Sequence, residues 1–173
     1  SEVERILETN FILFVSTIER RKNHDVLYRA CRLLMERGHE KEIPQLVFVG
    51  MPGWGVSDLL TDITLDPLVS QKISILHHVD DADLAKLYEH ALFCVYPSLY
   101  EGWGLPVGEA LYFEKAVIAS DRASIPEVGG DLVAYANPWN PDEWAALILK
   151  MSTDEEYRRS WEARVRQKYK KNP

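Results

Sequence analysis

The stretch "ISILHHVDDADLAKLYEHALFCVYPS", Ile73 to Ser98, contains a strand, a helix and a second strand in succession. Its two ends are short apolar runs. The middle has helical spacing behind aspartates that can cap free backbone amides. Strands that alternate with helices in this way are typical of a parallel sheet with helices on its faces. The stretch therefore predicts an α/β fold.

The same alternation continues along the rest of the chain, and we predict a Rossmann-like three-layer sandwich with a mainly parallel sheet of about six strands. We expect residues 1–10 to be a linker or leading segment, 11–153 the Rossmann-like domain and 154–173 a basic C-terminal helix of that domain. The stripe Tyr157, Trp161, Val165 and Tyr169 suits a helix that covers the domain, one that crosses to a missing partner half, or one that lies on a membrane surface. The predicted strands are 11–16, 45–50, 73–78, 92–98, 116–120 and 132–136.

Composition limits the class of protein. The chain has 173 residues, of which 46% are hydrophobic, so one domain with a substantial core is expected. A formal net charge of −7 argues against nucleic-acid binding. Cys31 and Cys94 are expected as buried thiols in a reducing compartment. With no signal peptide and no apolar run of about 20 residues, we predict a cytoplasmic protein, at most touching the inner face of the membrane. The missing initiator Met suggests a piece of a longer chain.

Three crossings from strand to helix carry unusual residues, and ligands of parallel sheets bind outside the carboxyl ends of the strands. In "STIERRKNH", Arg20, Arg21 and Lys22 suit either a diphosphate site or a solvated basic loop. In "VFVGMPGWG", the glycines allow close approach of a ligand or simply form turns. Neither segment is a G-x-G-x-x-G or P-loop fingerprint, which excludes the usual NAD-dehydrogenase pattern.

The third crossing, "YPSLYEGWGLPVGEALYF", places Glu101 in a loop and Glu109 in the helix that Pro106 begins. Amides at the start of that helix point toward any anion in the crevice. The two carboxylates could form a glycosidase pair, but a role in accepting hydrogen bonds from sugar hydroxyls fits a helix start better.

"PSLYEGWGLPVGEAL" resembles the E-x7-E signature of retaining nucleotide-sugar glycosyltransferases with the GT-B fold. The resemblance continues in order through "TIERRKNH", "LVFVG", "ILHHVDDADLAKLYEHALFCVYPS" and "VIASDRASIPEVGGDLVAYANPWNPDEWAALI". It covers nearly all of residues 11–150. It implies that this chain is the C-terminal, nucleotide-sugar-binding half of such an enzyme.

The resemblance also implies roles for single residues. Glu101 would accept hydrogen bonds from the donor sugar and Glu109 from the ribose. Arg21 and Lys22 would neutralise the pyrophosphate, which makes them, with Glu101, the expected catalytic residues. Ser16 and Thr17 stand where the family commonly has a glycine and a phosphate-binding arginine, so Arg20 or Arg21 would supply the guanidinium. The remaining donor-binding residues would be Gly50, His78, Val79, Gly102, Trp103, Gly104 and Leu105, with Trp103 either stacking on the sugar or packing beneath the loop.

The expected donor is GDP-mannose, with UDP-sugars as the alternative, and transfer would need no metal or cofactor. The acceptor would be a glycan or lipid-linked glycan held by an N-terminal half that this sequence lacks, so the chain alone should be inactive. A non-catalytic scaffold that kept the fold is the rival hypothesis. A metal site at His77 and His78 is not expected, and His24, His39 and His90 are expected to be solvated or capping residues.

Overall fold

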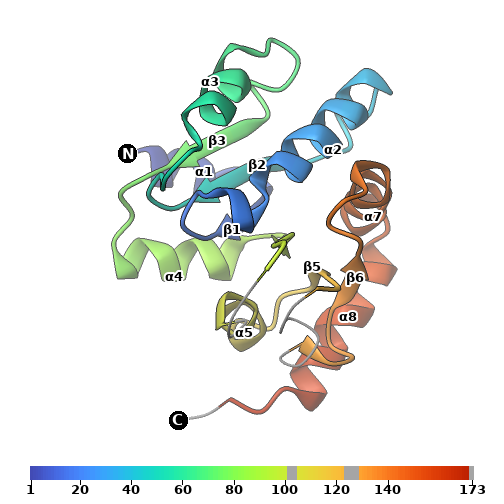
Figure 1. The fold of residues 1–173 in the computed structure, drawn as a ribbon. Coiled ribbons are helices and arrows are strands. Elements are labelled where there is room, and N and C mark those ends of the chain that lie inside the picture. Colours follow the sequence, from blue (N-terminus) through green and yellow to red (C-terminus); the bar gives the residue numbers. More distant parts are fainter. Residues whose placement is uncertain (101–104, 123–128, 172–173) are drawn as a thin grey trace.

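Six parallel strands form one sheet in the order β3-β2-β1-β4-β5-β6, as Figure 1 shows. The computed structural model describes residues 1–100, 105–122 and 129–171. Every neighbouring pair of strands is parallel. The predicted fold class is therefore confirmed. The strands are β1 (Phe11–Val15), β2 (Gln45–Val49), β3 (Ile73–Leu76), β4 (Phe93–Tyr96), β5 (Val117–Ser120) and β6 (Ala134–Ala136).

Helices cover both faces of the sheet. In Figure 1, α2 and α7 lie on one side of the strands, while α4 and α5 lie on the other. Helix α2 packs against α7, and α1 packs against α4. None of the helices in the described part of the chain is long and apolar enough to cross a bilayer. The helices are α1 (Glu2–Leu7), α2 (His24–Glu36), α3 (Ser57–Leu65), α4 (Asp81–His90), α5 (Leu105–Tyr112), α7 (Pro141–Thr153) and α8 (Glu155–Lys168), with a short 3-10 turn η1 (Arg20–Lys22).

Local sequence signals set several of the helix ends. Asp80 caps α4 by accepting a hydrogen bond from the amide of Asp83 at 2.8 Å. Asn140 caps α7 in the same way, with Pro141 at the first helical position. Gly38 follows α2 and takes a left-handed conformation with φ +83°, which glycine adopts at a helix end without strain. These ends follow from residues close in sequence, which is why the sequence predicts them.

β1 and β2 end one residue earlier than predicted, and β3 and β4 end two residues earlier. β3 ends at Leu76, whose register partner is Val49, the last residue of β2. The two histidines that follow, His77 and His78, are exposed and lie in the loop before α4. β4 ends at Tyr96 because Pro97 carries no amide hydrogen to continue the ladder.

Residues 1–10, expected as a leading segment, contain helix α1. Ser1 and Glu4 form a reciprocal capping box at its start, and Val3 and Ile6 are buried. The segment therefore contributes apolar surface to the core.

Helix α8 covers the domain with the stripe that the sequence shows. Val165 is buried, and Tyr157, Trp161 and Tyr169 pack against the core. Several basic side chains of this segment bind carboxylates on the domain: Lys168 to Asp131 at 3.1 Å, and Arg166 and Lys171 to Glu114 at 3.9 and 3.8 Å. These contacts favour packing on the domain over lying on a membrane.

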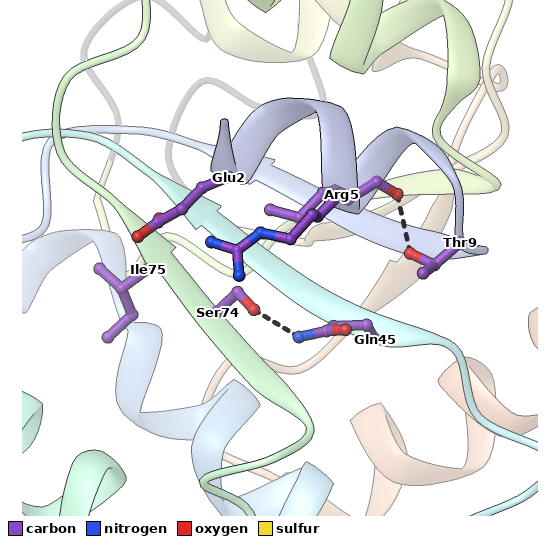
Figure 2. A pocket seen from close by; sticks show the side chains of 7 residues that line it. Glu2, Arg5, Thr9, Gln45, Ser74 and Ile75 are labelled. Atoms are coloured by element: carbon purple, nitrogen blue, oxygen red, sulfur yellow. Dashed lines mark hydrogen bonds between the residues drawn. The ribbon is translucent and has the colours of Figure 1, made fainter.

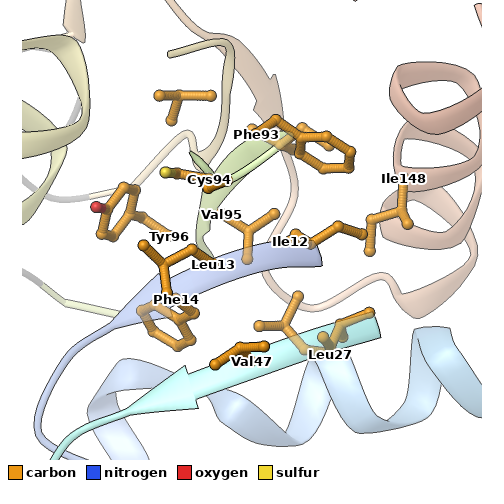
Figure 3. Close-up of a cluster of buried hydrophobic side chains, with 14 of the residues drawn as sticks. Ile12, Leu13, Phe14, Leu27, Val47, Phe93, Cys94, Val95, Tyr96 and Ile148 are labelled. Carbon is orange, nitrogen blue, oxygen red and sulfur yellow. The ribbon is translucent and has the colours of Figure 1, made fainter. Parts of the chain in front are cut away.

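The core is built around β1, the central strand. Figure 3 shows its side chains Ile12, Leu13 and Phe14 among those of neighbouring strands and of Leu27 (α2) and Ile148 (α7). All five side chains are at most 1% exposed. Burial of both faces explains why the strand is a continuous apolar run without alternation.

His24 belongs to this core, so the expectation of a solvated or capping histidine is wrong. Its ring stacks on Phe14 with 4.4 Å between ring centroids and meets the edge of Phe48. Neither ring nitrogen has a hydrogen-bond partner among the described residues. Burial, and secondarily the charge of Lys22, lowers the pKa of His24 from 6.5 to about 3. The imidazole is therefore neutral and serves as an aromatic core residue.

We predict that His24 makes the fold acid-sensitive. Its pKa is lower in the folded state than in the unfolded state, so its contribution is complete above pH 6.5 and is lost as the pH falls toward 3. Between pH 7 and pH 5, the free energy of unfolding should fall by about 2 kcal/mol on account of this residue. Urea unfolding of wild type and His24→Phe at both pH values measures it.

Between pH 7 and pH 5, the free energy of unfolding of His24→Phe should fall by about 2 kcal/mol less than that of wild type. The variant keeps an aromatic ring at this position but has no group that takes up a proton. His90→Gln, at an exposed position, serves as the control. Its free energy of unfolding should fall between the two pH values by as much as that of wild type. Equal pH dependence of wild type and His24→Phe would contradict the assignment.

Candidate functional site

The predicted site residues follow the carboxyl ends of neighbouring strands. Glu101, Gly102, Trp103 and Gly104 lie outside the described residues, and only the backbone of Leu105 is described, as the first residue of α5. The order of the sheet places the ends of β1, β2 and β4 side by side. The predicted site residues that the structure describes in full are Ser16 and Thr17 after β1, Arg21 and Lys22 in η1, Gly50 after β2, His78 and Val79 between β3 and α4, and Glu109 within α5.

Gly50 is required by the close approach of the ends of β1 and β2. A Cβ atom at this position would lie 1.8 Å from the carbonyl oxygen of Ser16. The Gly50 amide donates to Leu76 O at 2.9 Å, and His77 Nδ1 lies 3.1 Å from Gly50 O. The residue therefore holds the ends of β1, β2 and β3 together, which is a structural reason for the glycine beside any role in ligand binding.

The basic turn after β1 is firmly placed. Lys22 is 7% exposed, whereas Arg21 is half exposed and its Nε lies 3.3 Å from Glu19 Oε1. The carbonyl of Arg21 accepts a hydrogen bond from the amide of Leu99 at 2.8 Å. This bond joins the basic turn directly to the loop that follows β4, where Glu101 lies in the sequence.

Asn23 fixes this arrangement, and the sequence analysis did not single it out. Its Nδ2 donates to the carbonyl oxygens of Pro97 and Pro138, both at 2.9 Å. Pro97 follows β4 and Pro138 follows β6, so one buried amide links three crossings. Asn23 also has φ +66°, a conformation that asparagine tolerates better than most residues. An asparagine before a predicted helix could have indicated the left-handed conformation. The sequence could not indicate its two hydrogen-bond partners, because Pro97 and Pro138 are distant from Asn23 along the chain.

Glu109 lines a cavity of about 580 Å³ between α4 and α5. The Tyr88 hydroxyl donates to Glu109 Oε2 at 2.9 Å, while Glu109 itself is exposed. The volume lies in the range of small-molecule sites. The lining residues are Asp81, Leu84, Ala85, Tyr88, Gly108, Glu109, Tyr112, Phe113 and Tyr169.

A second cavity, of about 350 Å³, lies beside the basic turn. Glu19, Asn23 and Leu99 are among the residues that line it, together with the exposed Trp139. Leu99 and Gly108 thus flank the undescribed loop 101–104 in sequence and line different cavities. Of the predicted residues, Glu109 lines the first cavity, and Arg20, the alternative source of the guanidinium, lines the second.

A third cavity, of about 460 Å³, lies elsewhere and contains none of the predicted site residues. Figure 2 shows it beside α1, with Glu2 and Arg5 facing Gln45 and Ser74 of the sheet. Gln45 begins β2 and bonds Ser74 on β3, so this hollow lies near the amino ends of the strands. It lies away from the edge where ligands of parallel sheets bind.

Among residues 1–100, 105–122 and 129–171, no three His, Cys, Asp or Glu side chains are grouped as a metal site. The two thiols, Cys31 and Cys94, are buried and unpaired with each other, and burial raises the pKa of each to about 12. They behave as core residues.

An all-parallel Rossmann-like domain with a basic turn, a close glycine crossing and a carboxylate at one edge is the architecture of a nucleotide-binding half-domain. Residues 2–168 match the family model described as glycosyl transferases group 1, and the chain belongs to this family. The domain corresponds to the C-terminal half of a GT-B glycosyltransferase.

Two relatives are mannosyltransferases from Escherichia coli. O-antigen chain mannosyltransferase B is 36% identical over 148 residues, which cover 86% of this chain and 38% of that protein. Serotype-specific mannosyltransferase WbdA is 31% identical over 157 residues, 91% of this chain and 19% of that protein. The chain thus spans well under half the length of these relatives.

The fold is also shared with solved structures. Sucrose-phosphate synthase from Thermosynechococcus elongatus superposes with a TM-score of 0.76 at 22% identity, over 93% of this chain and 40% of that one. At this identity the likeness is one of fold.

We predict that the Asn23 side chain stabilises the carboxyl edge of the sheet through its two hydrogen bonds. Asn23→Gly keeps the left-handed conformation but removes both donors, so the free energy of unfolding should fall by about 2 kcal/mol. Asn23→Ala should lose roughly 1 kcal/mol more, because alanine is unfavourable at φ +66°. Urea unfolding of both variants measures the two contributions separately.

Glu114→Gly is the matched control, since Glu114 also has a positive φ, of +61°, but is half-buried and makes only long salt bridges, to Arg166 at 3.9 Å and Lys171 at 3.8 Å. It should change stability by less than about 1 kcal/mol. Wild-type stability in Asn23→Gly would show that the two carbonyl contacts are unimportant.

Proposed function

We propose that this chain is the donor-binding domain of a retaining glycosyltransferase that transfers mannose from GDP-mannose to a growing surface glycan. The observation that carries this proposal is the meeting of the basic turn, the Gly50 crossing and the start of α5 at one edge of the sheet. The acceptor, a glycan or lipid-linked glycan, would be held mainly by a further part of a longer protein.

The basic turn would hold the diphosphate. Lys22 is largely buried, and the hydrogen bond from Leu99 N to Arg21 O keeps the turn next to the loop that leads into α5. Amides at the start of a helix favour an anion, and α5 begins at Leu105. Arg21, half exposed, can move onto a bound phosphate without leaving a buried carboxylate unpaired. Positive charge placed in advance stabilises the leaving diphosphate, which is commonly the largest catalytic contribution.

Glu109 would hold the ribose and Glu101 the donor sugar. Glu109 is exposed on a cavity whose volume suits a nucleoside, and its carboxylate accepts hydrogen bonds from neighbouring hydroxyls. Gly50, His78 and the half-buried Val79 would line the base pocket, and Ser16 and Thr17 would complete the donor site. Glu101 and the amides of residues 102–105 would meet the sugar, as the family resemblance implies.

The choice of GDP-mannose rests on the relatives, which are named as mannosyltransferases. UDP-sugars are the second candidate, because the family resemblance does not distinguish between the bases of the donor nucleotide. We propose that no metal takes part, since Lys22 and Arg21 supply the charge that a cation would bring.

Transfer also needs an acceptor in line with the anomeric carbon and a cleft without water. The exposed edge of this domain forms one wall of such a cleft. The 173 residues should therefore bind donor without transferring its sugar.

We predict that the chain binds GDP in the micromolar to millimolar range, about −4 to −8 kcal/mol, and GDP-mannose at least as well. Titration calorimetry with GDP, UDP, ADP and GDP-mannose measures the preference. Glu109→Ala should weaken GDP and GDP-mannose alike, whereas Glu101→Ala should weaken only GDP-mannose, because each carboxylate meets a different part of the donor.

Absence of binding by every nucleotide, in a chain that is folded by circular dichroism, would defeat the proposal. Equal loss of GDP affinity in the two variants would defeat the assignment of the carboxylates. Tighter binding of UDP than of GDP would favour the UDP-sugar alternative. Sugar transfer by the chain alone would show that no second wall is needed.

A further inference from the structure

Three side chains from three elements form a hydrogen-bonded series that ends on Glu109. Tyr96 closes β4, Tyr88 lies on α4 and Glu109 lies on α5. The hydroxyl oxygens of Tyr96 and Tyr88 are 3.1 Å apart, and the Tyr88 hydroxyl lies 2.9 Å from Glu109 Oε2. Tyr88 and Tyr96 are 1% and 2% exposed. A buried polar pair thus leads from the core to an exposed carboxylate.

The direction of donation follows from counting protons. A phenol has one proton, and a carboxylate oxygen accepts, so the Tyr88 proton points to Glu109. Tyr96 must then donate to the Tyr88 oxygen. Burial is the main reason that the pKa values of both hydroxyls lie well above the usual range, so both stay protonated at neutral pH. A hydroxyl that accepts one hydrogen bond donates more strongly in the next.

Aromatic packing fixes both rings. Tyr88 stacks on Phe113 with 5.1 Å between centroids and an interplanar angle of 1°, and Tyr96 meets Phe14 edge to face at 5.8 Å. Neither hydroxyl can therefore leave its hydrogen bond, Tyr96 to Tyr88 or Tyr88 to Glu109, unless the core repacks. The exposed carboxylate, which would otherwise sample several rotamers, is held by a rigid donor.

We propose that Tyr88, backed by Tyr96, is a positioning residue that fixes the Glu109 carboxylate for recognition of a ribose diol. This inference rests on the proposed function, in which Glu109 meets ribose. Oε2 keeps a lone pair beside the Tyr88 bond, Oε1 is a second acceptor, and Glu109 and Tyr88 both line the same cavity. Placing the acceptor before binding avoids the entropy of ordering it at that step.

The proposal predicts a selective defect. Removing the Tyr88 hydroxyl should weaken ligands that carry ribose hydroxyls and leave other ligands unchanged. The probes are GDP and 2′,3′-dideoxy-GDP, which share base and diphosphate. The wild-type chain should bind GDP at least about tenfold more tightly than the dideoxy compound. Tyr88→Phe, which retains the ring that stacks on Phe113, should weaken GDP about fivefold and leave dideoxy-GDP unchanged.

Tyr28→Phe is the matched control. The Tyr28 hydroxyl also donates to a carboxylate, Asp66 Oδ2, at 2.6 Å, but between α2 and the end of α3. It should lose similar stability in thermal unfolding and keep the full discrimination between the two nucleotides. A double-mutant cycle of Tyr88→Phe with Glu109→Ala should be strongly non-additive, because without the carboxylate the hydroxyl has nothing to position.

Each result decides the matter. An unchanged GDP preference in Tyr88→Phe, an equal loss for both nucleotides, or additivity in the cycle overturns the inference while leaving the proposed function standing. A wild-type chain that binds both nucleotides equally defeats the ribose role of Glu109 itself, and absence of GDP binding defeats the proposed function. Should Tyr88→Phe fail to fold, Tyr96→Phe takes its place, with a loss of GDP preference of about twofold expected; retention of the full preference overturns the inference.

Discussion

The two hydrogen bonds from Asn23 to the carbonyls of Pro97 and Pro138 are the contacts on which the candidate site depends. They join the crossing after β1 to those after β4 and β6, elements separated in sequence by more than 70 residues. Lys22 precedes Asn23 and His24 follows it. Asn23 therefore fixes the position of both the Lys22 cation at the edge of the sheet and the His24 ring in the core. The Leu99–Arg21 backbone bond and the Gly50–Ser16 approach complete the rim. The preorganisation that the proposed diphosphate site needs is thus supplied by the buried Asn23 side chain and by backbone contacts, which changes to surface side chains leave intact.

The site combines rigid and adjustable parts. Lys22, Tyr88 and Tyr96 are buried, whereas Arg21, His78 and Glu109 are exposed. The buried members, and Glu109 through its hydrogen bond from Tyr88, are held in the absence of ligand, whereas Arg21 and His78 can move onto it. This division suits a domain that binds one face of a nucleotide sugar and leaves the other face open to a second wall.

Local patterns predicted most of the fold. The six strands are continuous apolar runs because parallel strands are buried on both faces, and caps such as Asp80 and Asn140 act over three residues. The basic turn and Glu109 were predicted at the carboxyl edge because the order of strands and helices fixes that edge. His24 was misjudged because its position at a helix start suggests solvent, whereas its ring stacks on Phe14 of β1. Tyr88 was missed because its hydrogen bond to Glu109 depends on how α4 packs beside α5. The sequence of neither helix indicates how close the two helices lie.

The central claim, that one edge of the sheet holds the diphosphate at the basic turn and the ribose at Glu109, is tested most directly by a crystal structure of this chain with GDP. The account predicts a phosphate oxygen within hydrogen-bond reach of Lys22 Nζ, and a ribose hydroxyl within about 3 Å of a Glu109 carboxylate oxygen that Tyr88 still contacts. GDP bound in the cavity beside Arg5 and Ser74, or at the carboxyl edge with its ribose turned away from Glu109, would contradict it.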